Sequence, residues 1–131
     1  MKGLLIKERW LDLILSGMKT WEIRGKATTV RGRIGLIQSG SGMVHGVCEV
    51  VDVQGPLSLE DMQANCHRHC IAREDIPGVV HYDRTYAWVL QGARRLSVPV
   101  RYDHPNGAVI WVNLPEQVDR QVEAASRSVR P

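Results

Sequence analysis

Phenylalanine is absent from this sequence of 131 residues, and aromatic residues make up only 5% of it, as four Trp and three Tyr. Long apolar runs are absent too, whereas a membrane-spanning helix needs about 20 consecutive apolar residues. The apolar run nearest the N-terminus, residues 3–6, is shorter than the roughly 7–15 residues of a signal-peptide core. We therefore expect no membrane partner and a cytoplasmic location.

Cysteine is scarce, with three residues at Cys48, Cys66 and Cys70. An odd number fits reduced thiols better than a disulfide framework, and Cys48 lies in a β-branched segment where a small core residue is expected. The length suits one domain and leaves little room for a second. We expect that domain at residues 1–114, followed at residues 115–131 by a polar tail or frayed helix that adds little to the core.

Acidic residues are scarce near the N-terminus. The net charge is +3, but residues 1–35 hold eight Lys or Arg against three acids, whereas residues 36–65 hold four acids and no Lys or Arg. A basic N-terminal third is compatible with a phosphate-bearing partner. An ordinary basic surface explains the charge distribution equally well.

Short strands separated by turn residues are the main pattern in the chain. Apolar residues at helical spacing predict a first helix at residues 7–16. Ser58, with Asp61 three residues later, predicts the N-cap of a second helix by a variant of the capping box. Five to seven short strands with two helices indicate an α+β fold, most simply a small mixed or antiparallel barrel. The expected strands are residues 2–6, 20–24, 33–38, 44–53 with a bulge at Gly46, 85–91, 94–100 and 108–114.

The stretch GMKTWEIRG follows the first predicted helix and alternates apolar with polar residues. In a strand, Trp21 and Ile23 then face the core, and Thr20, Glu22 and Arg24 share the opposite face about 6–7 Å apart. A solvated strand face with a Glu22–Arg24 ion pair explains this pattern. A ligand site with these side chains aimed at a bound molecule is the alternative.

This stretch also carries a family resemblance. Its pattern Gly-x-Lys-Thr-x-Glu-x-Arg resembles the hallmark of the ASCH domain, a member of the PUA-like superfamily. The resemblance continues through GRIGLIQSGSG and HGVCEVVDV to YAWVLQGARRL and HPNGAVIWVNL, and covers roughly residues 2–114. It implies a barrel of five or six mostly antiparallel strands flanked by helices, with a cleft beside the motif that receives RNA or a modified nucleobase.

The resemblance implies an RNA- or nucleotide-binding module as one function. Basic side chains would contact phosphate, Trp21 or Tyr86 would stack a base, and Glu22 would accept a hydrogen bond from a base amino group. The turn SGSG at residues 39–42 would let the backbone approach the ligand, or it is a plain hairpin turn. The expected ligand-binding residues are Lys19, Thr20, Trp21, Glu22, Arg24, Arg31, Arg33, Ser39, Ser41 and Tyr86.

Hydrolysis of a modified nucleoside or of RNA is the second function that the resemblance implies. ASCH-like amidohydrolases acting on N4-acetylcytidine rely on a Lys and a Thr in this motif and on a Glu from the second helix, and other members are ribonucleases. Lys19 is retained, but Glu22 occupies the Thr position, and Cys70 or a neighbour stands in place of the Glu, with Glu74 nearby. Lys19 and Glu22 are therefore the candidate catalytic pair. A protein-interaction domain with an incidental basic face is a third alternative.

The segment CHRHC at residues 66–70 contains the residue types that bind zinc. On a helix, Cys66, His69 and Cys70 share one face, and His81 would complete a set of four ligands. Because no second cluster at the usual zinc spacing follows, we favour core-facing cysteines with exposed histidines. We expect no metal and no other cofactor.

Overall fold

A six-stranded sheet runs through the molecule in the order β2-β5-β4-β3-β1-β6. The computed structural model describes residues 1–80 and 83–127, so the candidate ligand His81 and residues 128–131 of the expected tail lie outside the described residues. The strands are β1 (Lys2–Ile6), β2 (Trp21–Arg24), β3 (Gly32–Gln38), β4 (Met43–Gln54), β5 (Tyr86–Arg101) and β6 (Trp111–Asn113).

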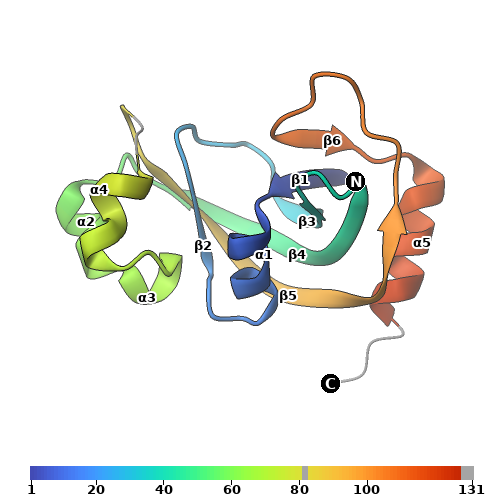
Figure 1. Ribbon diagram of the computed structural model, residues 1–131, viewed down its shortest axis with the longest axis horizontal. Coiled ribbons are helices and arrows are strands. Elements are labelled where there is room, and N and C mark those ends of the chain that lie inside the picture. The colour runs from blue at the N-terminus through green and yellow to red at the C-terminus, as the bar shows by residue number, and fades with distance from the viewer. Residues whose placement is uncertain (81–82, 128–131) are drawn as a thin grey trace.

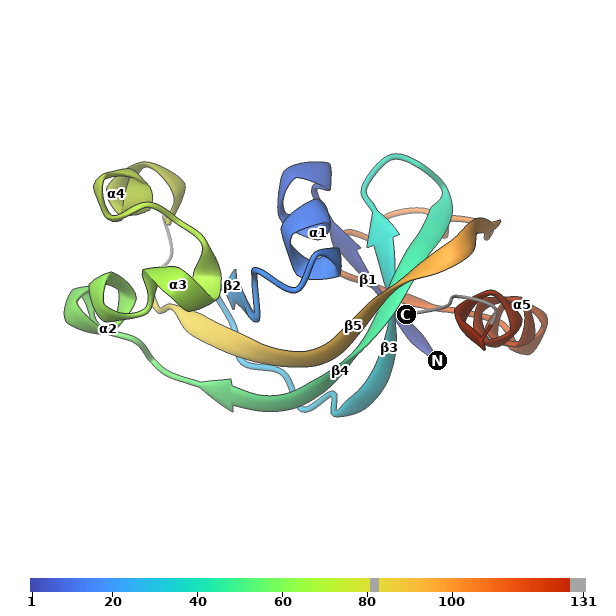
Figure 2. The ribbon, with the colours of Figure 1, turned by 90° about the horizontal axis from the view of Figure 1, so that it is seen from below.

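Neighbouring strands are antiparallel except for β1 and β3, which are parallel. The two longest strands, β4 and β5, bend so that the sheet curls into a half-barrel, as Figure 2 shows. The expected α+β class is confirmed, and so is the mostly antiparallel, barrel-like sheet.

The helices flank this sheet in three places (Figure 1). One helix, α1, lies against the middle of the concave face, whereas α2, α3 and α4 gather at one end of the molecule and α5 lies at the other. In the described part of the chain, no helix is long and apolar enough to span a membrane. The helices are α1 (Glu8–Leu15), α2 (Leu59–Ala64), α3 (Cys66–His69), α4 (Ile76–Val79) and α5 (Glu116–Arg127), with a short 3-10 helix at Arg73–Asp75.

The capping box predicted for the second helix is confirmed. The Ser58 hydroxyl accepts a hydrogen bond from the Asp61 backbone N–H, and the Asp61 carboxylate accepts one from the Ser58 N–H. The helix ends early because Asn65, with φ −124° and ψ 26°, leaves the helical conformation and divides α2 from α3.

Three strand predictions are wrong in their bounds. Residues 85–91 and 94–100 form one continuous β5, because both halves pair with β4 and Gly92 continues the strand with a positive φ of 66°. The strand expected at residues 108–114 is reduced to the three residues of β6. The bulge predicted at Gly46 is confirmed, since the register of β4 shifts between Val44 and Gly46.

Three clusters of buried side chains form the core. One lies beneath α5, one between α1 and the concave face of the sheet, and one between β2, β5 and the helices α2 to α4. Trp21 and Ile23 belong to the third cluster, as the strand alternation predicts. Cys48 is fully buried in the second cluster, as expected, and burial raises the pKa of its thiol to about 12.

The expectation that residues 115–131 add little to the core is wrong. Most of this segment is helix α5, and its Val118, Val122 and Ala125 are buried in the first cluster. These residues are spaced three and four apart, so they form one narrow apolar stripe on a helix whose other faces are polar. An ion pair between the Met1 amino group and Asp119 ties α5 to the start of β1.

Candidate functional site

A cavity of about 280 Å³, here called the central cavity, lies where β1, the start of α1, β2 and the chain around α4 meet. It combines a charged side with an apolar side, a composition typical of ligand pockets. Its polar lining residues are Lys7, Lys19, Glu22, Arg24 and Ser39, and its apolar ones are Leu5, Trp10, Ile23, Ile71, Val79, Val80 and Val109.

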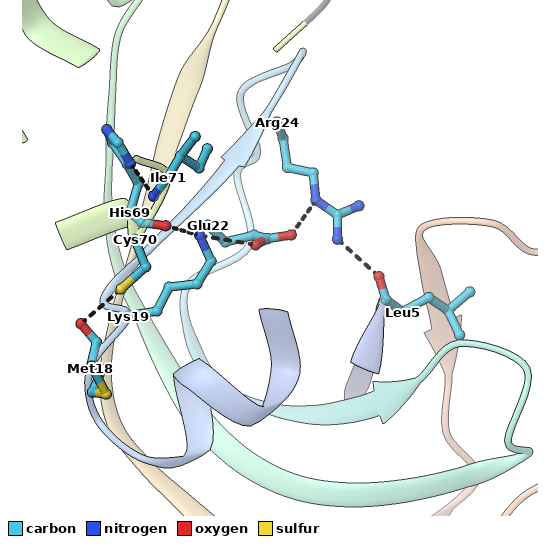
Figure 3. A network of polar contacts seen from close by, with 8 residues as sticks. All are labelled: Leu5, Met18, Lys19, Glu22, Arg24, His69, Cys70 and Ile71. Atoms are coloured by element: carbon cyan, nitrogen blue, oxygen red, sulfur yellow. Dashed lines mark hydrogen bonds and ion pairs between the residues drawn. The ribbon is translucent and has the colours of Figure 1, made fainter. Parts of the chain in front are cut away.

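Lys19 lies at the inner end of the charged side and is only 2% exposed. Its Nζ donates a hydrogen bond of 2.6 Å to the backbone carbonyl of His69 and lies 3.9 Å from Glu22 Oε1 (Figure 3). The same Nζ stands 4.8 Å from the centre of the Trp10 ring, within range of a cation–π interaction. Burial lowers the pKa of Lys19, and the nearby Glu22 carboxylate opposes this effect.

Glu22 and Arg24 continue the network from Lys19 toward β1. Arg24 Nε donates a 2.8 Å hydrogen bond to Glu22 Oε2, and Arg24 Nη2 donates one of 2.9 Å to the backbone carbonyl of Leu5. Glu22 is 5% exposed, so its carboxylate is held between two cations and largely away from solvent. The Glu22–Arg24 pair expected at the strand surface is therefore part of a buried network.

Side chains at this site also close the half-barrel. Arg24 reaches from β2 to β1, and Trp88 of β5 stacks on Trp111 of β6 with ring centroids 5.6 Å apart and planes 7° apart. Strands β2 and β5 lie at one end of the strand order, and β1 and β6 lie at the other. The central cavity is thus located where the two ends of the curled sheet approach each other.

The carbonyl that receives Lys19 is held in place by the His69 ring. His69 Nδ1 accepts a 2.9 Å hydrogen bond from the Ile71 N–H, so Nε2 carries the proton and donates to the Met62 carbonyl at 2.7 Å. Burial lowers the pKa of His69, which favours this neutral tautomer. The next residue, Cys70, ends α3 in the left-handed conformation with φ 61°.

The prediction of exposed histidines in CHRHC is therefore wrong for His69, which is fully buried, whereas His67 is exposed. Cys66 and Cys70 are only partly buried, and Cys70 Sγ lies 3.4 Å from the Met18 carbonyl. Among the described residues, no group of three or more His, Cys, Asp or Glu side chains is arranged to hold a metal ion.

The structure brings together Lys19, Glu22, Arg24 and Ser39 from the expected ligand-binding set. Ser39 contributes from the turn between β3 and β4. The neighbouring Ser41 instead donates its hydroxyl to the Gln38 carbonyl at 2.7 Å and thereby stabilises the turn itself.

Other members of the expected set lie elsewhere. Thr20 is exposed outside the cavity, Trp21 is 3% exposed in the third core cluster, and Tyr86 packs against the second. Arg31 donates to carbonyls of its own loop, and Arg33 pairs with Glu123 and Ser126 of α5. Their predicted ligand roles are untested, and since none of them lines the central cavity, a ligand bound only there would not require them.

Several groups that shape the cavity are not among the residues expected from the sequence. Lys7 and Trp10 come from the start of α1, Val109 comes from the segment before β6, and the His69 carbonyl is a backbone group. The spacing of Trp10 on an amphipathic helix predicts only that it faces the protein. A backbone carbonyl leaves no signal in the sequence at all.

Comparison with known proteins adds a family and a fold. The model of the ASCH domain family matches residues 4–102. Similar solved structures include ASCH from Zymomonas mobilis, with a TM-score of 0.69, 12% identity, and coverage of 94% of this chain and 93% of that chain. A serine-to-alanine variant of that protein has a TM-score of 0.70 and 12% identity, with coverage of 94% of this chain and 94% of that chain. A tyrosine-to-phenylalanine variant has a TM-score of 0.69 and 12% identity, with coverage of 94% of this chain and 96% of that chain. At this identity the likeness shows the fold alone. Comparison with curated proteins gave no significant match.

Proposed function

The chain belongs to the ASCH domain family, and on this premise we propose that the central cavity binds a nucleoside unit of an RNA. The observation that carries the proposal is the buried network of Lys19, Glu22 and Arg24 on the wall of an open cavity. Lys19 and Glu22 are buried and Arg24 is partly buried; burying charged groups has a large desolvation cost, and replacing such groups by apolar residues often stabilises a protein. Their presence beside a cavity is therefore better explained by ligand recognition than by stability.

The lining residues supply the contacts that an unstacked base and the sugar–phosphate backbone attached to it need. The Glu22 carboxylate can accept from a base amino group, and Lys7 and Arg24 can donate to phosphate or sugar oxygens. Trp10 and Ile71 provide apolar surface for the base. The volume of about 280 Å³ lies near the lower end of the roughly 300–1,000 Å³ of ligand pockets, which suits one nucleoside rather than a larger molecule.

The test compares cations inside and outside the cavity. Fluorescence anisotropy with a labelled, mixed-sequence single-stranded RNA decamer measures binding of an RNA strand. Calorimetry with the four ribonucleosides and N4-acetylcytidine measures binding of a single nucleoside. We expect Lys7→Ala and Arg24→Ala to weaken RNA binding by about tenfold or more, and Arg31→Ala to change it by less than about twofold.

Lys7 and Arg31 form a matched pair because both are exposed, and the Lys7 side chain makes no capping hydrogen bond to α1. Thermal unfolding establishes that each variant is folded. An equal loss in Lys7→Ala and Arg31→Ala would place binding outside the central cavity. Failure of the wild-type protein to bind the decamer and all the nucleosides would overturn the proposed function and favour a protein-interaction domain.

Hydrolysis is a second candidate function, favoured by one specific observation. Burial lowers the pKa of Lys19, and its Nζ lies 3.9 Å from a carboxylate oxygen of Glu22. Such a pair can exchange a proton with a bound amide or phosphodiester. Incubation with N4-acetylcytidine and with single-stranded and structured RNA, followed by product analysis, tests this. Turnover by the wild type that is lost in Lys19→Met would support hydrolysis. If no substrate gave a product, RNA binding without hydrolysis would remain as the proposed function.

A further inference from the structure

A second cavity of about 650 Å³ adjoins the central cavity on the other side of Arg24. Arg24 lines both cavities, so its guanidinium stands between them. The other side chains of this second cavity are Lys26, Asp83, Arg84, Trp88 and Ile110. None of these five lines the central cavity, so the two cavities are distinct spaces with one shared wall.

Arg24 has hydrogen-bonding capacity left for a ligand. An arginine carries five N–H donors in a planar fork. Among the described residues, its acceptors are Glu22 Oε2 and the Leu5 carbonyl, each reached by one donor. These two bonds fix the plane of the guanidinium, and the donors that remain are available at the boundary between the cavities. An acceptor group that binds these donors would therefore lie between the two cavities.

The rim of the second cavity is positively charged. Lys26 and Arg84 are both exposed, and within the described residues neither side chain has a hydrogen-bond or ion-pair partner. Asp83 is the one acidic residue among the described lining residues. Cations that do not pair with protein carboxylates and converge on one concave surface are suited to a phosphate group.

Two large apolar side chains, Trp88 and Ile110, also line this cavity. Trp88 is 3% exposed, stacks on Trp111, and donates its Nε1–H to the Lys26 carbonyl at 2.8 Å. This bond ties the loop that carries Lys26 to β5. Ile110, 38% exposed, adds apolar surface here, while its neighbour Val109, 76% exposed, does so in the central cavity. Two consecutive residues thus serve the two cavities.

We propose that the second cavity binds the adjacent nucleotide of the RNA strand whose nucleoside occupies the central cavity, with the connecting phosphate at Arg24 and the next one at Lys26 and Arg84. This inference rests on the proposed function, since it requires a nucleoside in the central cavity. It identifies the ligand as a strand of at least two nucleotides, rather than a free nucleoside. Bases in both cavities must be unstacked, which single-stranded RNA permits.

The experiment removes the two rim cations, in the variant Lys26→Ala/Arg84→Ala. The control Lys2→Ala/Arg101→Ala loses the same charge from exposed positions that line neither cavity. The probes are the labelled single-stranded RNA decamer, titrated over a range of salt concentrations, and the four ribonucleosides with N4-acetylcytidine. The nucleosides carry no phosphate, so their binding does not depend on a phosphate contact to the rim cations.

We expect the rim variant to bind the decamer about tenfold more weakly than the wild type. Its salt dependence should fall by about 0.7 in the slope of log affinity against log salt, the amount for one lost phosphate contact to a single strand. Nucleoside affinities should stay at the wild-type value. The control variant should bind the decamer within about twofold of the wild type, because salt screens the attraction between the RNA and exposed charges that do not contact it.

Equal weakening in the rim and control variants would overturn the second site and leave the central cavity intact. So would a rim variant that binds the decamer as tightly as the wild type. A wild-type protein that binds neither the decamer nor any nucleoside would overturn the proposed function as well, so the two failures are distinguishable.

Discussion

Glu22 is the residue on which the charged side of the central cavity depends. It lies between Lys19, at 3.9 Å, and Arg24, at 2.8 Å, and its neighbours contact backbone carbonyls in two distant parts of the chain. Removing its charge leaves two cations without their shared carboxylate in a poorly solvated place. The site is therefore sensitive to single substitutions that change charge and preserve shape.

We predict that Glu22→Gln lowers the free energy of unfolding by about 1–3 kcal/mol, because a buried charge-assisted hydrogen bond is weakened and the cations lose their partner. Glu123→Gln is the control, since it removes a half-exposed carboxylate paired with Arg33 and should cost about 0–1 kcal/mol. Urea denaturation of both variants measures the difference. Equal effects would show that the buried network contributes no more than a surface pair.

Lys19 gives the stability a dependence on pH. Burial holds its pKa below the ordinary value of 10.5, so between the two values the unfolded chain binds more protons than the native protein. The free energy of unfolding then rises with pH across this window. Lys19→Met lacks the titrating group, so the stability of the wild type relative to this variant should increase as the pH rises toward 10.5. Urea denaturation across this range checks it, and a flat or falling difference would contradict it.

At the scale of elements, the C-terminal helix shows how a few apolar residues determine packing. Helix α5 is mostly charged and polar, yet Val118 and Val122 are both buried against the sheet. Arg33 of β3 also pairs with Glu123 on the same helix, so an ion pair links β3 to α5. This pairing uses an arginine that the family resemblance had suggested for phosphate contact.

We predict that Val122→Ala destabilises the protein by about 1–3 kcal/mol, the range for removing buried methyl groups. The adjacent Gln121→Ala, on the exposed face of α5, should change the free energy of unfolding by less than about 0.5 kcal/mol. Thermal or urea unfolding of the two variants measures both. A negligible effect of Val122→Ala would restore the view of this segment as a tail.

At the scale of the whole molecule, two different kinds of interaction hold the half-barrel together. Backbone hydrogen bonds join the strands that are neighbours in the sheet. The two ends of the curled sheet are joined by side chains instead, through Arg24 to the Leu5 carbonyl and through Trp88 to Trp111. Both proposed binding cavities lie at this junction. Ligand contacts there would add to the few interactions that hold the two ends together.

We predict that amide hydrogen exchange is slowest in β3 and β4, which pair with a strand on each side, and fastest in the edge strands β2 and β6. Native-state exchange followed by NMR measures this order. RNA binding at the junction should slow exchange in β2 and β6 more than in β4. Equal protection of β2 and β4 in the free protein would show that side-chain closure is as strong as strand pairing.

The sequence by itself determined the features that depend on local chemistry. Alternation in β2 identified Trp21 and Ile23 as core residues, Ser58 and Asp61 predicted the cap of α2, and the family motif predicted the fold. Each of these follows from residues within a few positions of one another. Alternation also predicted that Glu22 and Arg24 pair, but tertiary structure alone decided that this pair is part of a largely buried network and which distant residues it meets.

Long-range packing decides which of the expected ligand-binding residues lie together and which other residues join them. Arg33 turns to α5, Lys19 is buried against the carbonyl of residue 69, and Trp10 and Val109 enter the cavity from separate segments. These contacts join parts of the chain that lie far apart in sequence, and they depend on how the sheet curls. Strand periodicity specifies only two faces, so it cannot say which polar face is covered by another element and which stays in water.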